Sequence, residues 1–169
     1  MCSSDLRGFD AIANIVFHGT FYVTHSVGRR WIESGLKGNI ISILATWVWT
    51  GSPYVVPSAM SKSAINAMTK SLAVEWGPYN IRVNAIAPGP FPTEGAWARL
   101  SPKGDLDNDS SYSAIPLGRV GEMSELQNLA SFLMADGCDY LTGQTIAIDG
   151  AQYITGGGTF SGQIGRAHV

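Results

Sequence analysis

The chain lacks the features that mark several classes of protein. It has only two cysteines in 169 residues, Cys2 and Cys138, which excludes a disulfide framework and makes a reducing compartment the expected one. Neither has a second cysteine or a histidine nearby in the sequence, so we predict no metal site and no cysteine nucleophile. The net charge is -2 and there is no basic run, so nucleic acid is not an expected partner.

Long apolar runs are also missing. The run 40–45 is too short to cross a bilayer, and the first residues have neither the basic start nor the apolar centre of a secretion signal. Hydrophobic residues make up 45% of the chain and charged residues 14%, a balance typical of a protein with a buried core. We therefore expect one cytoplasmic globular domain without a membrane partner.

Helical and strand patterns alternate along the chain. Apolar residues recur at helical spacing in three segments, and each of these is followed by a short apolar segment typical of a buried strand. The predicted helices are 9–36, 58–76 and 124–135, and the predicted strands are 40–45, 81–87 and 145–149. Ser124 is the predicted cap of the last helix. The alternation predicts an α/β fold with a parallel sheet, in which ligands bind beyond the carboxyl ends of the strands.

Two segments carry the residues of a candidate site. Ser58 and Lys62 are four residues apart at the start of a predicted helix, so their side chains share one helix face. The second segment, Pro88-Gly89-Pro90-Phe91 with Thr93, is a turn that directly follows an apolar strand. Both segments belong to the edge of the sheet where a ligand is expected.

These motifs, with Ala73-Val74-Glu75-Trp76-Gly77 at the end of the helix, resemble the back half of the short-chain dehydrogenases/reductases. Most of that superfamily carries tyrosine where Ser58 stands. Serine after Pro57 narrows the resemblance to the 2,4-dienoyl-CoA reductases, and the resemblance covers residues 8 to about 162. It implies NADPH-dependent reduction of a 2,4-dienoyl-CoA to an enoyl-CoA in fatty-acid beta-oxidation, by a homotetramer whose substrate is an acyl-CoA thioester.

The resemblance also implies which residues bind the cofactor and the substrate. Lys62 would contact the nicotinamide ribose, and Pro88-Gly89-Pro90-Phe91 with Thr93 would contact the nicotinamide carboxamide or the diphosphate. Arg99 would contact the acyl-CoA, since a guanidinium binds phosphate in a bidentate manner. NADP(H) is favoured over NAD(H), and no metal is expected.

The catalytic residues depart from the family pattern. Trp47 stands where the dienoyl-CoA reductases carry an active-site tyrosine. Its indole can donate a hydrogen bond to a thioester oxygen but has no acidic proton, so it is either an orienting donor or a packing aromatic. Thr46 is a second hydroxyl candidate, and Ser58 and Lys62 complete the catalytic set, although a serine hydroxyl is too weak an acid to replace tyrosine. His18 stands where the superfamily usually carries the asparagine of a proton relay, and a core or interface role is an equal alternative.

The sequence predicts only part of a dinucleotide-binding fold. No G-x-G-x-x-G turn occurs, and Gly156-Gly157-Gly158 follow the last predicted strand. We therefore expect the C-terminal half of a Rossmann-like doubly wound parallel sheet over residues 7–163, with a strand edge and apolar surface left uncovered. Residues 1–6 and 164–169 are expected to be non-native, because DNA that encodes the first can encode part of the second on its opposite strand, and that DNA matches a sequencing adapter.

Two other functions stay open at this point. One is a different short-chain reductase that acts on an enoyl- or 3-ketoacyl thioester. The other is a non-catalytic protein that binds acyl-CoA or a nucleotide, which the absence of tyrosine at both Trp47 and Ser58 favours.

Overall fold

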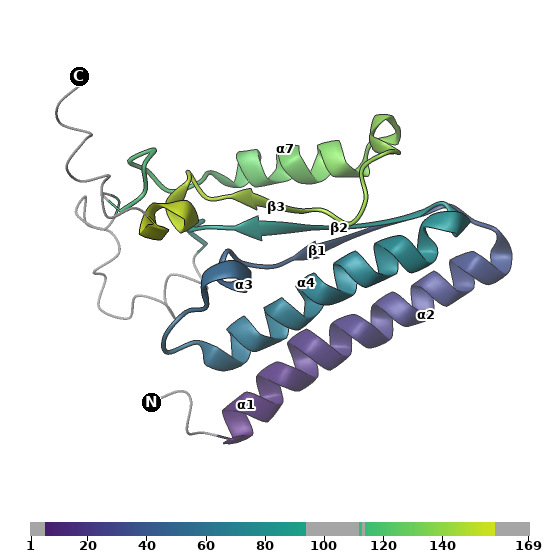
Figure 1. Cartoon of the computed structure of the whole chain (residues 1–169), viewed down its shortest axis with the longest axis horizontal. Helices are drawn as coiled ribbons and strands as arrows, with labels where there is room; N and C mark the ends of the chain where they lie inside the picture. The colour runs from purple at the N-terminus through teal and green to yellow at the C-terminus, as the bar shows by residue number, and fades with distance from the viewer. Residues whose placement is uncertain (1–5, 94–111, 113, 158–169) are drawn as a thin grey trace.

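The computed structural model describes residues 6–93, 112 and 114–157. They form three layers around a three-stranded parallel sheet of order β1-β2-β3. The long helices α2 and α4 cover one face of the sheet, and α7 covers the other (Figure 1). The predicted α/β class and the doubly wound arrangement of helices on both faces are therefore confirmed.

The strands lie close to their predicted positions. They are β1 (Gly38–Ile43), β2 (Ile81–Pro88) and β3 (Thr145–Ile148). The central strand β2 pairs Val83 with Ile40 of β1, and Ile86 with Ile146 of β3. All of residues 81–87 are buried, which explains why this segment is apolar on both faces rather than alternating.

The first predicted helix is confirmed as three consecutive helical segments. They are α1 (Leu6–Ile12), a π-helical stretch (Ala13–His18) and α2 (Gly19–Ser34). The helix ends at Gly35, whose N–H donates to the Ile32 carbonyl, while the Leu36 N–H donates to the Trp31 carbonyl. Val16 of the π-helical stretch packs against a core cluster that contains Leu44 and Ile65.

The remaining helices follow the strands. They are α3 (Trp47–Thr50), α4 (Val56–Trp76), α7 (Met123–Met134), and the 3-10 turns Gly77–Tyr79, Asp136–Cys138 and Gln152–Gly157. The prediction that Ser124 caps α7 is wrong, because the helix begins one residue earlier. Glu122 is the N-cap and forms a capping box with Glu125, whose carboxylate accepts the Glu122 N–H at 2.8 Å.

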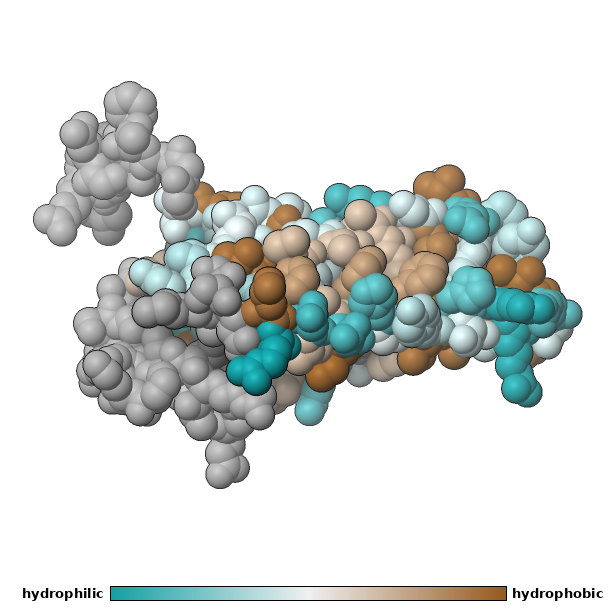
Figure 2. All heavy atoms as spheres, turned by 90° about the horizontal axis from the view of Figure 1, so that it is seen from below, coloured by the Kyte–Doolittle hydropathy of each residue, from teal (hydrophilic) through white to brown (hydrophobic). Residues whose placement is uncertain are grey.

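The core lies between β2 and the helices α2 and α4. One cluster contains Ala73, Trp76, Ile81 and Val83, and the other contains Leu44, Ile65, Ala85 and Ala87. The outer helical face also carries apolar side chains, visible as brown patches in Figure 2. The exposed apolar residues of the helical segments 13–34 and 56–76 include Phe17, Phe21, Tyr22, Val23, Val27, Met60 and Val74. No helix within the described residues is long and apolar enough to cross a membrane.

Candidate active site

The carboxyl ends of the three strands meet at one edge of the sheet, and hydrogen bonds join them there. The Thr46 N–H donates to the Pro88 carbonyl at 3.4 Å, and the Gly89 N–H donates to the Ile148 carbonyl at 3.0 Å. Thr46 is buried, with 7% of its surface exposed. The structure therefore brings Thr46 and the start of the Pro88-Gly89-Pro90-Phe91 turn together at this edge.

Lys62 reaches this edge from the second turn of α4. Its ammonium donates a hydrogen bond to the carbonyl of Ile43, the last residue of β1. The side chain is half-buried, and burial lowers the pKa of the ammonium. Ser58, also half-buried, lies one turn earlier on the same face of α4, as the spacing predicts. A lysine ammonium has three N–H donors, so it can bond hydroxyl groups of a ligand while it holds Ile43.

Trp47 begins the short helix α3 directly after Thr46. Its side chain is half-buried, and its carbonyl accepts the Gly51 N–H at 2.8 Å, which closes the helix. The indole N–H makes no hydrogen bond to any described residue. It is therefore available as a donor to a ligand at this edge.

Gly89 has a structural reason to be glycine. A Cβ at this position would lie 2.5 Å from the Cβ of Asp149 and 2.8 Å from its Cα. The family resemblance predicts that this Pro-Gly turn approaches the nicotinamide closely. The structure shows that the turn also approaches the end of β3, so the glycine is needed even without a ligand.

Asn84 lies in the middle of β2, four residues before Pro88. It is fully buried, donates through Nδ2 to the Leu141 carbonyl at 2.8 Å and accepts the Gln144 N–H at 3.0 Å. Both partners belong to the segment that leads into β3. Asn84 therefore holds that segment against β2 rather than contacting the strand ends.

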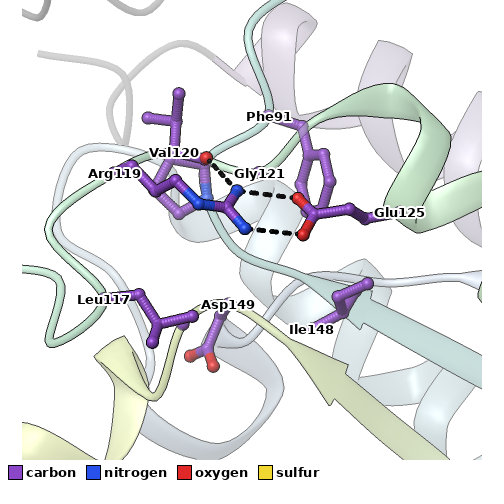
Figure 3. Close-up of a pocket in the computed structure, with 10 residues that line it drawn as sticks. Phe91, Leu117, Arg119, Val120, Gly121, Glu125, Ile148 and Asp149 are labelled. Atoms are coloured by element: carbon purple, nitrogen blue, oxygen red, sulfur yellow. Dashed lines mark hydrogen bonds and ion pairs between the residues drawn. The ribbon is translucent and has the colours of Figure 1, made fainter.

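Phe91 lines a small cavity of about 70 Å³ beside the turn (Figure 3). Its ring lies against Gly121, where a Cβ would come within 2.4 Å of the ring, and the Gly121 N–H donates to the Pro90 carbonyl at 3.0 Å. The side chain therefore anchors the turn to the start of α7. A cavity of this size holds small molecules such as water and is too small for a nicotinamide ring.

An ion pair closes the far side of this cavity. Arg119 donates to both carboxylate oxygens of Glu125, at 2.7 and 2.8 Å (Figure 3). These hydrogen bonds, together with the Glu122 N–H, lower the pKa of Glu125 to about 2, and the pKa of Arg119 is raised. No sequence pattern predicts this pair, since the capping-box signature has Ser, Thr, Asp or Asn at the N-cap, where this chain has Glu122.

The sequence analysis also missed a second aromatic contact at the edge. Trp49 of α3 stacks on Tyr153, with ring centroids 4.7 Å apart and an interplanar angle of 28°. Tyr153 lies in the 3-10 turn after β3, where its N–H donates to Asp149 at 2.7 Å. No pattern within either segment indicates that these two aromatic residues meet.

The other predicted residues lie apart from this group or outside the described residues. Thr93 is exposed at the end of the described part of the turn, and the prediction for Arg99 falls outside the described residues. His18 is exposed on the helical face, where its ring lies 4.9 Å from that of Phe17 and 6.0 Å from that of Tyr22.

Comparisons with known proteins agree with the fold. The family model described as Enoyl-(Acyl carrier protein) reductase matches residues 1–151. An uncharacterized oxidoreductase of Caenorhabditis elegans is 42% identical over 93% of this chain and 50% of its own length. The probable 2,4-dienoyl-CoA reductase decr-1.2 of the same organism is 43% identical over 86% of this chain and 48% of its own length. The chain thus spans about half the length of the curated relatives it matches.

Solved structures are similar over the same part of the chain. A short chain dehydrogenase from Bacillus anthracis is 43% identical with a TM-score of 0.76, covering 88% of this chain and 56% of that one. A gluconate 5-dehydrogenase from Burkholderia cenocepacia, in complex with NADP and tartrate, is 30% identical with a TM-score of 0.81, covering 89% and 58%. A 4-hydroxyisoleucine dehydrogenase mutant complexed with NADH and succinate is also 30% identical with a TM-score of 0.81, covering 91% and 61%.

Proposed function

Because this chain belongs to the short-chain dehydrogenase/reductase family, we propose that the intact protein is a reductase of 2,4-dienoyl-CoA thioesters. The product would be an enoyl-CoA, as in fatty-acid beta-oxidation. Residues 7–163 would be the C-terminal portion of its one domain, with residues 1–6 and 164–169 as non-native ends. NADPH is the cofactor we propose, although relatives of similar fold bind NADP or NADH.

One observation carries this proposal. Serine, not tyrosine, stands one turn before Lys62 on α4, at the point where the ammonium reaches the end of β1. A tyrosine at that position would be the proton donor of a carbonyl reductase of this family. Reduction of a conjugated thioester needs hydrogen-bond donors for the thioester oxygen instead, because negative charge moves to that oxygen.

Some residues at this edge would bind the cofactor, and others would bind the substrate. When bound, the cofactor supplies the hydride for the far end of the diene. Lys62 would hold the nicotinamide ribose through N–H donors that Ile43 leaves free, and the Pro88-Gly89-Pro90-Phe91 turn with Thr93 would border the nicotinamide. The Trp47 indole N–H and the Thr46 hydroxyl would donate to the thioester oxygen, and the Lys62 charge would add to that stabilisation.

The exposed helical face bears on how the intact protein assembles. The apolar side chains exposed on α2 and α4 suit contacts between copies, so we propose a homotetramer assembled through this face (Figure 2). Arg99 would contact the acyl-CoA phosphates. We also propose a cytoplasmic location, because two cysteines in 169 residues suit a reducing compartment.

The test is NADPH oxidation by the full-length protein with a 2,4-dienoyl-CoA as substrate. An enoyl-CoA and a 3-ketoacyl-CoA of the same chain length are the matched controls, and NADH replaces NADPH in a parallel series. We expect turnover with the dienoyl-CoA and the larger kcat/KM with NADPH. Turnover only with a control thioester would favour the other short-chain reductase.

A non-catalytic protein that binds acyl-CoA or a nucleotide is the second candidate function. Trp47 favours it, because an indole has no acidic proton to donate. None of Thr46, Trp47 and Ser58 has a side chain acidic enough to replace the tyrosine of the family. NADPH binding measured by fluorescence, with no oxidation on any of the three thioesters, would establish this alternative.

A further inference from the structure

The helix that carries Trp47 cannot be stable by itself. It has four residues, Trp47–Thr50, and its N-cap Thr46 makes no side-chain capping hydrogen bond. A single helical turn is far below the length at which helices persist alone in water. Its position therefore depends on contacts with the rest of the molecule.

The Trp49–Tyr153 stack supplies such a contact from the far end of the site. Tyr153 follows β3, whereas Trp49 follows β1, and β2 lies between these strands. Adjacent strands are roughly 4.8 Å apart, so the pair joins chain segments about two strand spacings apart. The two rings therefore bridge the sheet edge over the carboxyl end of β2.

The Tyr153 side of the stack is held firmly in place. Asp149 is 9% exposed, and its carboxylate accepts the Ala151 N–H at 3.0 Å and the Tyr153 N–H at 2.7 Å. The same residue packs against Gly89 of the turn after β2. Tyr153 is thus tied to the end of β3 through a buried carboxylate, whereas α3 is held by Val48, which packs against the core cluster that contains Leu44 and Ile65, and by the stack itself.

From this geometry we infer that Trp49 and Tyr153 are positioning residues: their stack fixes α3 and thereby directs the Trp47 indole into the thioester site. Trp47 and Trp49 are two residues apart, about 200° around the helix axis. Anchoring Trp49 on Tyr153 therefore turns Trp47 to the opposite side of α3. This inference rests on the proposed function, because it assigns the Trp47 donor to the thioester oxygen.

The test compares Tyr153→Ala with Tyr153→Phe in the full-length protein. Phenylalanine keeps an aromatic partner for Trp49, so it should retain wild-type kcat. Alanine should lower kcat roughly tenfold, since displacement of an active-site group by about 1 Å can cost up to about 100-fold. NADPH affinity should stay within about twofold in both variants, because no cofactor residue is changed. Trp49→Ala should match Tyr153→Ala, and the double variant should be no worse than either.

A second readout does not depend on catalysis. Amide hydrogen exchange of the peptide covering 46–51 should accelerate in Tyr153→Ala and stay at the wild-type level in Tyr153→Phe. Faster exchange in a protein without dienoyl-CoA reductase activity would support the contact and overturn the proposed function. Unchanged exchange in Tyr153→Ala, or unchanged kcat in an active enzyme, would overturn the inference itself.

Discussion

Gly89 and Asp149 approach one another so closely that position 89 has no room for a side chain. An added Cβ would lie 2.5 Å from the Asp149 Cβ and 2.8 Å from its Cα. Asp149 cannot move aside, because its carboxylate accepts two backbone N–H groups of the turn that follows. The contact joins the ends of β2 and β3, so the candidate site is built on two strands that must stay in register.

Gly89→Ala should therefore destabilise the protein. Overpacking of this kind costs about 1–3 kcal/mol of unfolding free energy, and here the nearest neighbours include backbone atoms of Asp149, which cannot rotate away. Gly137→Ala is the matched control, since nothing lies within 4 Å of a Cβ there and its φ is outside the left-handed region. Urea denaturation of the full-length variants measures both. Equal stability of Gly89→Ala and Gly137→Ala would contradict the role assigned to the contact.

The sequence predicted the framework of this site better than its details. The apolar segments and the Ser58–Lys62 spacing are local patterns of the sequence. The strands, the helix α4 and the shared face of Ser58 and Lys62 could therefore be predicted. The predicted cap of α7 was wrong because Ser124 belongs to a residue type that commonly caps helices. The actual cap, Glu122, depends on the Glu125 side chain, whose carboxylate accepts the Glu122 N–H. The predicted cap therefore lies two residues after the actual one, Glu122.

Contacts between distant segments were beyond the sequence patterns. Trp49 and Tyr153 are separated by most of the chain, and only the order of the parallel strands brings them together. The same holds for Gly89 and Asp149. A Pro-Gly turn after a strand indicates a ligand site, but nothing in the turn itself reveals a neighbouring strand end.

Lys62→Met should weaken NADPH binding without unfolding the protein. A hydrogen bond from a charged donor contributes about 1.5–3 kcal/mol, so Kd should rise roughly tenfold or more. Lys70→Met is the control, because Lys70 is exposed on the same helix. Fluorescence titration with NADPH measures both variants. A Kd for Lys62→Met equal to that of Lys70→Met would exclude Lys62 from the cofactor site.

The pH dependence of this binding follows from the burial of Lys62. Burial lowers the pKa of the ammonium below the usual 10.5, so the charge is lost at a lower pH than on an exposed lysine. The contribution of Lys62 to NADPH binding should be complete at neutral pH and should fall as the pH rises through the lowered pKa. Titrations from pH 7 upward should show the decline in the wild type and a flat profile in Lys62→Met.

Glu125→Gln should lower the thermal stability at neutral pH and have little effect in acid. The carboxylate has a folded-state pKa of about 2, against an ordinary value of 4.5, so its stabilisation is complete above 4.5 and is lost as the pH falls toward 2. Glu33→Gln, which breaks the exposed Arg29–Glu33 pair, is the control and should be nearly neutral. Melting temperatures of both proteins at pH 7 and at low pH test this expectation. A difference in melting temperature between wild type and Glu125→Gln that stays constant over that pH range would contradict a stabilising role of the Glu125 carboxylate.

Trp47→Tyr should raise the rate of dienoyl-CoA reduction. A tyrosine hydroxyl keeps a hydrogen-bond donor near the thioester oxygen and adds an acidic proton, and a positioned acid contributes roughly 100-fold or more. We expect kcat to rise by less than that full effect, roughly 10-fold, because the tyrosine side chain is smaller than tryptophan and less well placed. Trp47→Phe removes the donor and should lower kcat about fivefold, the cost of one neutral hydrogen bond of about 1 kcal/mol.

Comparison of these two variants separates the roles of the indole. If the Trp47 N–H orients the substrate, Trp47→Phe falls below the wild type while Trp47→Tyr rises above it, with NADPH affinity unchanged in both. If Trp47 only packs, Trp47→Phe retains the wild-type kcat, because phenylalanine preserves an aromatic ring at a half-buried position. In that case Thr46, buried at the same strand end and bonded through its N–H to Pro88, becomes the donor to test next, by Thr46→Val.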